Sequence, residues 1–219
     1  MKPDPAEGLI RQLAEDLKPV RIVPRLRVSL GAVLALVVGF GALVLLASGP
    51  REQLWQALSG DVCFGGVFAG LLLAALGGSV AGLAGGAPGR EWVFRIGGVV
   101  AILGLLGAVV VSGFFTAVRG WTSGSDLAAD GMCFEHVVVF GALPALALVG
   151  LVLRGWVQRP LATAILTLVG GVALGGLVAQ VTCTFSGARH LLVGHVSPLW
   201  MLALVGAVPL ALLLRRLAR

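Results

Sequence analysis

Cysteine and histidine supply the most reactive side chains of this 219-residue chain, which contains only three of each. Thiolate and imidazole groups together suit soft or borderline metal ions such as zinc or copper, whereas thiols alone suit an oxidation switch. No Cys-x-x-Cys motif occurs, so metal ligands would have to converge from separate segments. A metal site, a redox-active thiol and ordinary packing all stay open. These residues, with a neighbouring carboxylate, are Cys63, Cys133, Glu135, His136, Cys183, His190 and His195.

Two local pairs of these residues can be judged from helix geometry. Cys133 and His136 are three residues apart, so a helix places them on one face, and they are the local pair best placed for direct contact. His190 and His195 are five residues apart. That spacing separates them by roughly 140° around an α-helix, so they need not share one face.

Six long apolar runs must position these residues, and each is near the ~20 residues that a helix needs to cross a ~30 Å hydrocarbon layer. Hydrophobic residues make up 58% of the chain and charged residues 12%, unlike a soluble domain. The sequence therefore predicts an all-α polytopic membrane protein with six transmembrane helices in three hairpins. The predicted spans are Val28–Ala47, Val62–Ala84, Ile96–Val118, Phe134–Leu153, Leu161–Val181 and Leu191–Leu214.

Basic residues are distributed unequally between the two sides of these spans. If the N-terminus is cytoplasmic, the inner segments hold 13 of the 16 Lys and Arg residues, and only Arg51, Arg119 and Arg189 lie outside. This pattern follows the positive-inside rule and predicts that both termini are cytoplasmic, in a bacterial inner membrane. Every cysteine and histidine then lies at the outer face, where thiols can form disulfides. The net charge of +6 is explained by topology and anionic lipid, so no direct nucleic-acid binding is expected.

The spans themselves carry small residues rather than charges. No Asp, Glu, Lys or Arg lies near the middle of any predicted span, which argues against a pump or coupled transporter. Glycines recur at four-residue spacing, which lets two helices approach closely. This spacing favours packing inside one bundle, with homo-oligomerisation as the alternative, so the oligomeric state stays open. The glycine pairs are Gly66 and Gly70, Gly78 and Gly82, and Gly171 and Gly175.

The N-terminal 27 residues form the only sizeable segment expected in the cytoplasm. Leu9, Ile10, Leu13 and Leu17 make an apolar stripe at helical spacing, and charged residues occupy the remaining surface. About three turns of helix are marginal alone in water, so the stripe needs something to pack against. The membrane surface and a groove on a protein partner both stay open.

Three parts of the chain together resemble the NrsF family of bacterial inner-membrane anti-sigma factors. They are the leucine-rich segment Leu9–Val20 ending in Lys-Pro-Val, Cys133 within six spans, and the ending from Cys183 to Pro198, which reads Cys…His-Leu-Leu-x-x-His-x-x-Pro. Light-responsive membrane anti-sigma factors of myxobacteria have a similar size and architecture. The resemblance implies that the N-terminal segment binds a sigma factor of the extracytoplasmic-function (ECF) type. It also implies that Cys133 and Cys183 take part in signal reception.

Two positions depart from the family pattern as it is expected here. Cys63 is not a position associated with that pattern, and Thr184 stands where many relatives are expected to have proline. These departures leave the identity of the signal open, and sensing need not use a cysteine pair.

The residues and the resemblance together predict a membrane-bound anti-sigma factor, not an enzyme, with no cofactor. Residues 1–27 are the cytoplasmic sigma-binding segment, 28–214 the transmembrane bundle and 215–219 a basic cytoplasmic tail. An envelope, redox, metal or light-derived signal is expected to act at the outer face and release the sigma factor. The alternative function is a small thiol–disulfide or quinone-linked membrane oxidoreductase that uses the outer cysteines. The candidate signal-sensing residues are Cys133, His136, Cys183, His190 and His195.

Overall fold

The computed structural model describes residues 25–120 and 127–217, together with Gly8, Ile10, Gln12 and Ala14. Within these residues the chain is helical and contains no β-strand. Six helices, the last beginning at Ala188, are long and apolar enough to cross a membrane. The elements are α2 (Leu26–Ser48), α3 (Leu54–Gly60), α4 (Val62–Gly85), α5 (Glu91–Arg119), α6 (Leu127–Val152), α7 (Pro160–Thr182), α8 (Ala188–His190), the π-helix η1 (Leu191–Val196) and α9 (Ser197–Leu217).

The predicted all-α class and the six long apolar helices are confirmed, and most span boundaries agree within a few residues. The main difference lies in α6, which begins at Leu127 rather than at Phe134. Apolarity alone placed the start late, because Asp130 and Gly131 interrupt the hydrophobic run. The earlier start puts Asp130 and Cys133 on the first two turns of a helix, three residues apart and therefore on one face.

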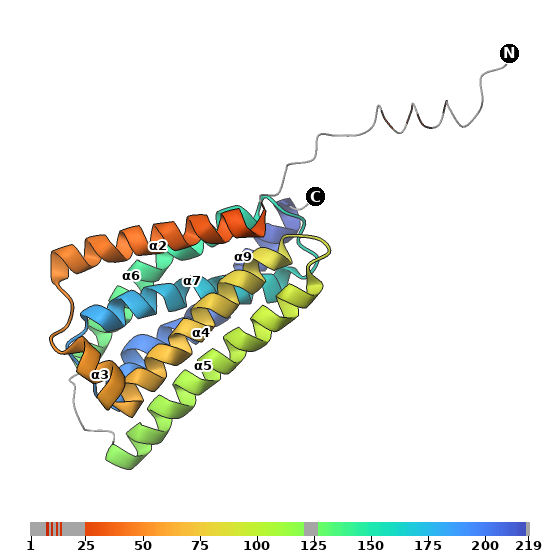
Figure 1. The fold of residues 1–219 in the computed structure, drawn as a ribbon. Helices are drawn as coiled ribbons and strands as arrows, with labels where there is room; N and C mark the ends of the chain where they lie inside the picture. The colour runs from red at the N-terminus through yellow and green to blue at the C-terminus, as the bar shows by residue number, and fades with distance from the viewer. Residues whose placement is uncertain are drawn as a thin grey trace.

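Helices α4 and α7 form the centre of the bundle (Figure 1). The most hydrophobic stretches of α4 and α7 are 67% and 56% buried, whereas that of α2 is only 6% buried. Helix α5 packs along α4, and α6 and α9 pack along α7. The most extensive contacts between consecutive spans therefore join α4 to α5, α6 to α7 and α7 to α9, while α5 and α6 make few contacts within the described residues.

Glycines make the close packing of the central helices possible. A Cβ atom built on Gly78 would lie 2.7 Å from the Cα atom of Gly170, and one built on Gly175 would lie 2.4 Å from that of Gly141. No side chain fits at these crossings, so the backbones of α4, α6 and α7 meet directly. All six glycines of the predicted pairs face other segments of the same chain, which confirms the internal-packing interpretation.

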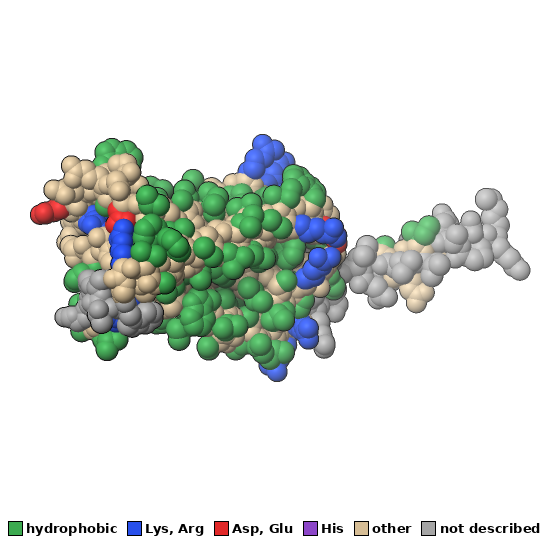
Figure 2. Space-filling view, turned by 90° about the horizontal axis from the view of Figure 1, so that it is seen from below, with side chains coloured by type: hydrophobic (Ala, Val, Ile, Leu, Met, Phe, Trp, Pro, Cys, Tyr) green, Lys and Arg blue, Asp and Glu red, His purple; other side chains and the backbone are tan. Residues whose placement is uncertain are grey.

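The two ends of the bundle differ in chemistry. The end where α4 and α6 begin and α7 ends carries Cys63, Cys133 and Cys183, and we call it the cysteine end. The opposite end carries Arg90, Arg95, Arg154, Arg159, Arg215 and Arg216, and we call it the arginine end. Figure 2 shows hydrophobic side chains over the middle of the visible face and Lys and Arg side chains toward both ends, with more of them at one end.

The N-terminal prediction falls mostly outside the described residues. Leu9, Leu13 and Leu17 are among the residues that the structure does not describe. Ile10 is described, is helical, and has 64% of its surface exposed.

Candidate functional site

Two cysteines and two histidines converge at the cysteine end. Cys133 lies on α6, Cys183 directly follows α7, His190 ends α8, and His195 lies in η1. One ligand atom from each of the four side chains lies within 4.8 Å of all the others. The sulfur atoms of Cys133 and Cys183 are 3.3 Å apart, and the Cys183 sulfur is 3.2 Å from Nε2 of His190. All four residues are buried.

A π-helical turn brings the two histidines together. In an α-helix, residues five apart lie roughly 140° apart around the axis, so the sequence left open whether His190 and His195 share a face. They do share one, because residues 191–196 form a π-helix, in which hydrogen bonds join residues five apart. Each residue then lies nearly above the fifth residue before it. The centroids of the two imidazole rings are 5.3 Å apart.

Asp130 orients His190 from the first turn of α6. Its carboxylate accepts a hydrogen bond from Nδ1 of His190 at 2.8 Å and forms an ion pair with Arg189 at 2.7 Å. A carboxylate only accepts, so the proton of the neutral imidazole stays on Nδ1. Nε2 therefore presents its lone pair to the Cys183 sulfur and to the centre of the cluster.

His195 is buried without the hydrogen bonds that a buried imidazole normally makes. Its exposed fraction is 0%, and within the described part of the chain neither Nδ1 nor Nε2 has a hydrogen-bond partner. An unsatisfied buried polar group costs about 1–3 kcal/mol. Such a cost at a cluster of reactive side chains points to a function rather than to packing.

The Cys183 thiol follows the last turn of α7 and is the best placed of the three cysteines to ionise. The Cys133 thiol donates a hydrogen bond to the Cys183 sulfur, and the imidazoles of His190 and His195 lie close beside that sulfur. These contacts hold the pKa of Cys183 below its usual value, and they outweigh burial, which acts in the opposite direction. A thiolate at this position is both a metal ligand and a nucleophile.

An open cleft gives access to the cluster from the surface of the bundle. It has a volume of about 220 Å³ and lies between α2, α6 and α7. Cys133 and Cys183 line it from the inside, and Ser48 and Phe140 line it nearer the surface. Both cysteines therefore border a cleft that opens at the surface of the bundle.

The other predicted site residues lie apart from the cluster. His136 is exposed and stacks on Phe140 with ring centroids 5.5 Å apart, so the predicted local pair with Cys133 is not the arrangement that forms the cluster. His136 does line the cleft beside Cys133. Cys63 is fully buried at the start of α4, where Asp61 caps the helix by accepting from its backbone N–H at 2.9 Å. Glu135 is exposed.

Sequence reasoning missed the roles of Asp130 and Arg189. Arg189 was counted only among the outer arginines and Asp130 was not singled out, yet both are buried and together hold His190 in place. One signal was available, because Asp130 and Cys133 are three residues apart and share a face if the helix extends that far.

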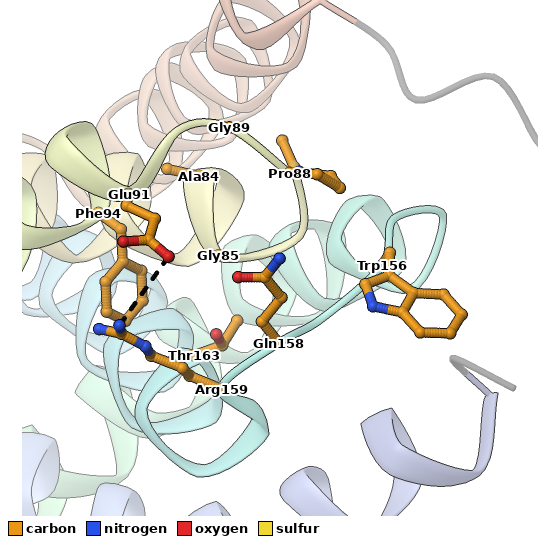
Figure 3. A pocket seen from close by; sticks show the side chains of 11 residues that line it. Ala84, Gly85, Pro88, Gly89, Glu91, Phe94, Trp156, Gln158, Arg159 and Thr163 are labelled. Atoms are coloured by element: carbon orange, nitrogen blue, oxygen red, sulfur yellow. Dashed lines mark ion pairs between the residues drawn. The ribbon is translucent and has the colours of Figure 1, made fainter.

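A second hollow lies at the arginine end and has a different character (Figure 3). It measures about 30 Å³ and lies between the α4–α5 and α6–α7 turns. Arg159 and Glu91 bridge it with an ion pair of 4.0 Å in which both side chains are more than half exposed. Exposed ion pairs of this kind contribute about 0–1 kcal/mol to stability. The Arg159–Glu91 pair therefore links the two turns only weakly, and we do not assign the hollow a chemical role.

The chain was compared with known proteins and protein families. Comparison with curated proteins gave no significant match, and neither did comparison with solved structures. One family matches residues 13–216, which include the six spans, the four clustered residues and the second half of the predicted N-terminal helix. On that match, which covers nearly the whole chain, the protein belongs to the NrsF family, described as "Negative regulator of sigma F".

Proposed function

We propose that this protein is a membrane-bound anti-sigma factor that sequesters an ECF-type sigma factor and is not itself an enzyme. The family assignment over residues 13–216 is the observation that carries the proposal. Because six apolar helices occupy most of the described chain, the sigma factor would be held at the membrane surface. It is thereby kept away from RNA polymerase.

The proposed orientation places both termini in the cytoplasm of a bacterial cell, with the protein in the inner membrane. Eight described arginines at the arginine end, with Arg25 and Arg27 at the start of α2 included, support it, because basic residues flank spans on the cytoplasmic side. Helix α2 begins and α9 ends at that same end (Figure 1). The cysteine end then faces outward, toward an oxidising compartment.

The sigma-binding element is the N-terminal stripe of Leu9, Ile10, Leu13 and Leu17. A short amphipathic helix binds by laying its apolar face in a hydrophobic groove of the partner, with anchors at helical spacing. The 64% exposure of Ile10 supports this, because an exposed bulky apolar side chain can be buried against a partner.

Signal reception is placed at the cysteine end, around Cys133, Cys183, His136, His190 and His195. Helices α6 and α7 carry the two cysteines at this end and run to the arginine end, where α2 joins the N-terminal segment. A signal that binds one arrangement of these helices better than another shifts the population of bundle states. That shift would change how well the N-terminal segment can bind the sigma factor.

A charge placed in the stripe tests the proposal. We expect Leu13→Asp to weaken co-purification of the sigma factor by at least about 30-fold, since a buried anchor contributes about 2 kcal/mol or more. Gln12→Asp is the matched control, because it adds the same charge beside the stripe and should keep binding. Both full-length variants are compared for membrane insertion. Equal binding by Leu13→Asp and the parent protein would overturn the proposal.

A thiol–disulfide oxidoreductase is the second candidate, favoured by the 3.3 Å separation of the Cys133 and Cys183 sulfurs. In that reaction the two thiols become one disulfide, and two electrons and two protons pass to a substrate disulfide. The full-length protein would then catalyse turnover of a model disulfide with dithiothreitol as reductant, and Cys133→Ser would abolish it. A rate no higher than the uncatalysed rate would exclude this candidate.

A further inference from the structure

We propose that Cys133, Cys183, His190 and His195 form a tetrahedral binding site for a zinc-class metal ion at the cysteine end of the bundle. The proposal does not depend on the sigma factor, because the metal content of the purified chain tests it directly.

The spacing of the four ligand atoms fits one ion at their centre. With Zn–S bonds of about 2.3 Å and Zn–N bonds of about 2.0–2.1 Å, the edges of the tetrahedron are about 3.3–3.8 Å long. The measured Cys133–Cys183 and Cys183–His190 distances are 3.3 Å and 3.2 Å, and no pair of ligand atoms is more than 4.8 Å apart. Small side-chain movements suffice to close this geometry.

The donor set selects the kind of ion. Two thiolates and two imidazoles are the Cys₂His₂ set of structural zinc sites, whereas magnesium and calcium require oxygen ligands. Two thiolates also neutralise a divalent cation, so the occupied site carries no net charge. A neutral site can be buried at far lower cost than a bare ion.

His195 supplies an observation independent of the spacing. Within the described residues its ring nitrogens lack hydrogen-bond partners although the side chain is completely buried. A metal ion at the centre of the cluster would satisfy one of them and lower the cost of burying the imidazole.

Asp130 provides the outer support that histidine ligands of metal ions usually have. Such histidines donate their second ring N–H to a carboxylate, which fixes the tautomer and raises the basicity of the ligating nitrogen. The 2.8 Å hydrogen bond from Nδ1 of His190 to Asp130 has this arrangement, and Arg189 holds the same carboxylate at 2.7 Å.

The proposed ion would tie three segments of the chain together. Its ligands come from α6, from the residue after α7, and from the turn that leads into α9. Loading or removing the ion would therefore change how firmly α6, α7 and α9 are joined at the cysteine end.

The first test uses the full-length protein, purified in detergent under reducing conditions and stripped of metal. Titration with Zn²⁺ is expected to saturate at one ion per chain, and Co²⁺ is expected to give the visible absorption of a tetrahedral thiolate complex. Zn²⁺ should also slow alkylation of Cys133 and Cys183 more than tenfold without protecting Cys63. Absence of the Co²⁺ spectrum, or equal protection of all three thiols, would overturn the proposal.

The second test compares site variants with a cysteine control. Cys133→Ser and His195→Gln are expected to lower Zn²⁺ affinity at least a hundredfold. Cys63→Ser should bind like the parent, because the Cys63 side chain does not belong to the cluster. Unchanged affinity in Cys133→Ser would contradict the assignment. If a variant fails to fold, the alkylation experiment on the unaltered protein still tests whether Cys133 and Cys183 are metal ligands.

Discussion

At the scale of single residues, Asp130 is important because its one carboxylate contacts both Arg189 and His190. It is 2% exposed, and its carboxylate forms a buried ion pair with Arg189 and a hydrogen bond with His190. The same carboxylate therefore takes part in a buried ion pair and orients a candidate metal ligand. Breaking a buried ion pair by removing one partner costs about 3–5 kcal/mol, because the remaining charge stays in a poorly solvated place.

We expect Asp130→Ala to destabilise the bundle by about 3–5 kcal/mol and to weaken Zn²⁺ binding by about 10–100-fold. Asp130→Asn keeps an oxygen that can accept from His190 and should recover part of the metal affinity. Thermal unfolding in detergent and Zn²⁺ titration measure the two effects separately. Glu135→Ala is the control, because this exposed carboxylate on the same helix should change stability by less than about 0.5 kcal/mol. Equal effects of Asp130→Ala and Glu135→Ala would contradict the role assigned to Asp130.

At the scale of elements, two features place the site: the glycine crossings and the π-helical turn. The crossings set the spacing of α4, α6 and α7, and α6 and α7 deliver Cys133 and Cys183. The π-helical turn then aligns His190 and His195 on the same side of the chain. A change in either feature should therefore disturb the cluster even where it touches none of the four residues.

Gly78→Val tests the crossings. Its new side chain would collide with the backbone of Gly170, so we expect a loss of about 1–3 kcal/mol in stability as the helices separate. Gly107→Val is the matched control, because nothing lies within 4 Å of a Cβ atom built there. Thermal unfolding in detergent compares the two variants. A Gly78→Val protein as stable as Gly107→Val would show that the crossing tolerates separation.

At the scale of the whole molecule, the two ends of the bundle carry different chemistry and are proposed to face different compartments. Most of the described arginines lie at one end and the cysteines and buried histidines at the other. Figure 2 shows the apolar middle between the two ends. Such a molecule can pass a change at one surface to a segment at the opposite surface only through its helices.

Reporter fusions test this orientation. Alkaline phosphatase needs an oxidising compartment for its disulfides, so it should be active when joined after Gly120, at the cysteine end, and inactive after Gly89, at the arginine end. Expression of each fusion is checked by immunoblotting. The reverse pattern would place the N-terminal segment outside the cell and exclude capture of a sigma factor.

Much of the architecture was predictable because hydropathy, charge bias and small-residue spacing are local properties that add along the chain. They located six helices and identified glycines that pack internally. They placed the start of α6 too late, because Asp130 and Gly131 interrupt the hydrophobic run, and hydropathy does not show that tertiary contacts bury Asp130.

The sequence by itself determined the membrane class of this protein, its pattern of basic residues and the list of groups able to react. Only the tertiary structure decided which of those groups meet. The fold brings the sulfur atoms of Cys133 and Cys183 into contact although 50 residues separate them, and it places His190 beside His195. It leaves Cys63 and His136 outside this cluster. The physical reason is that such convergence depends on how helices cross and on a local change in hydrogen-bond register, and neither is a property of any single segment.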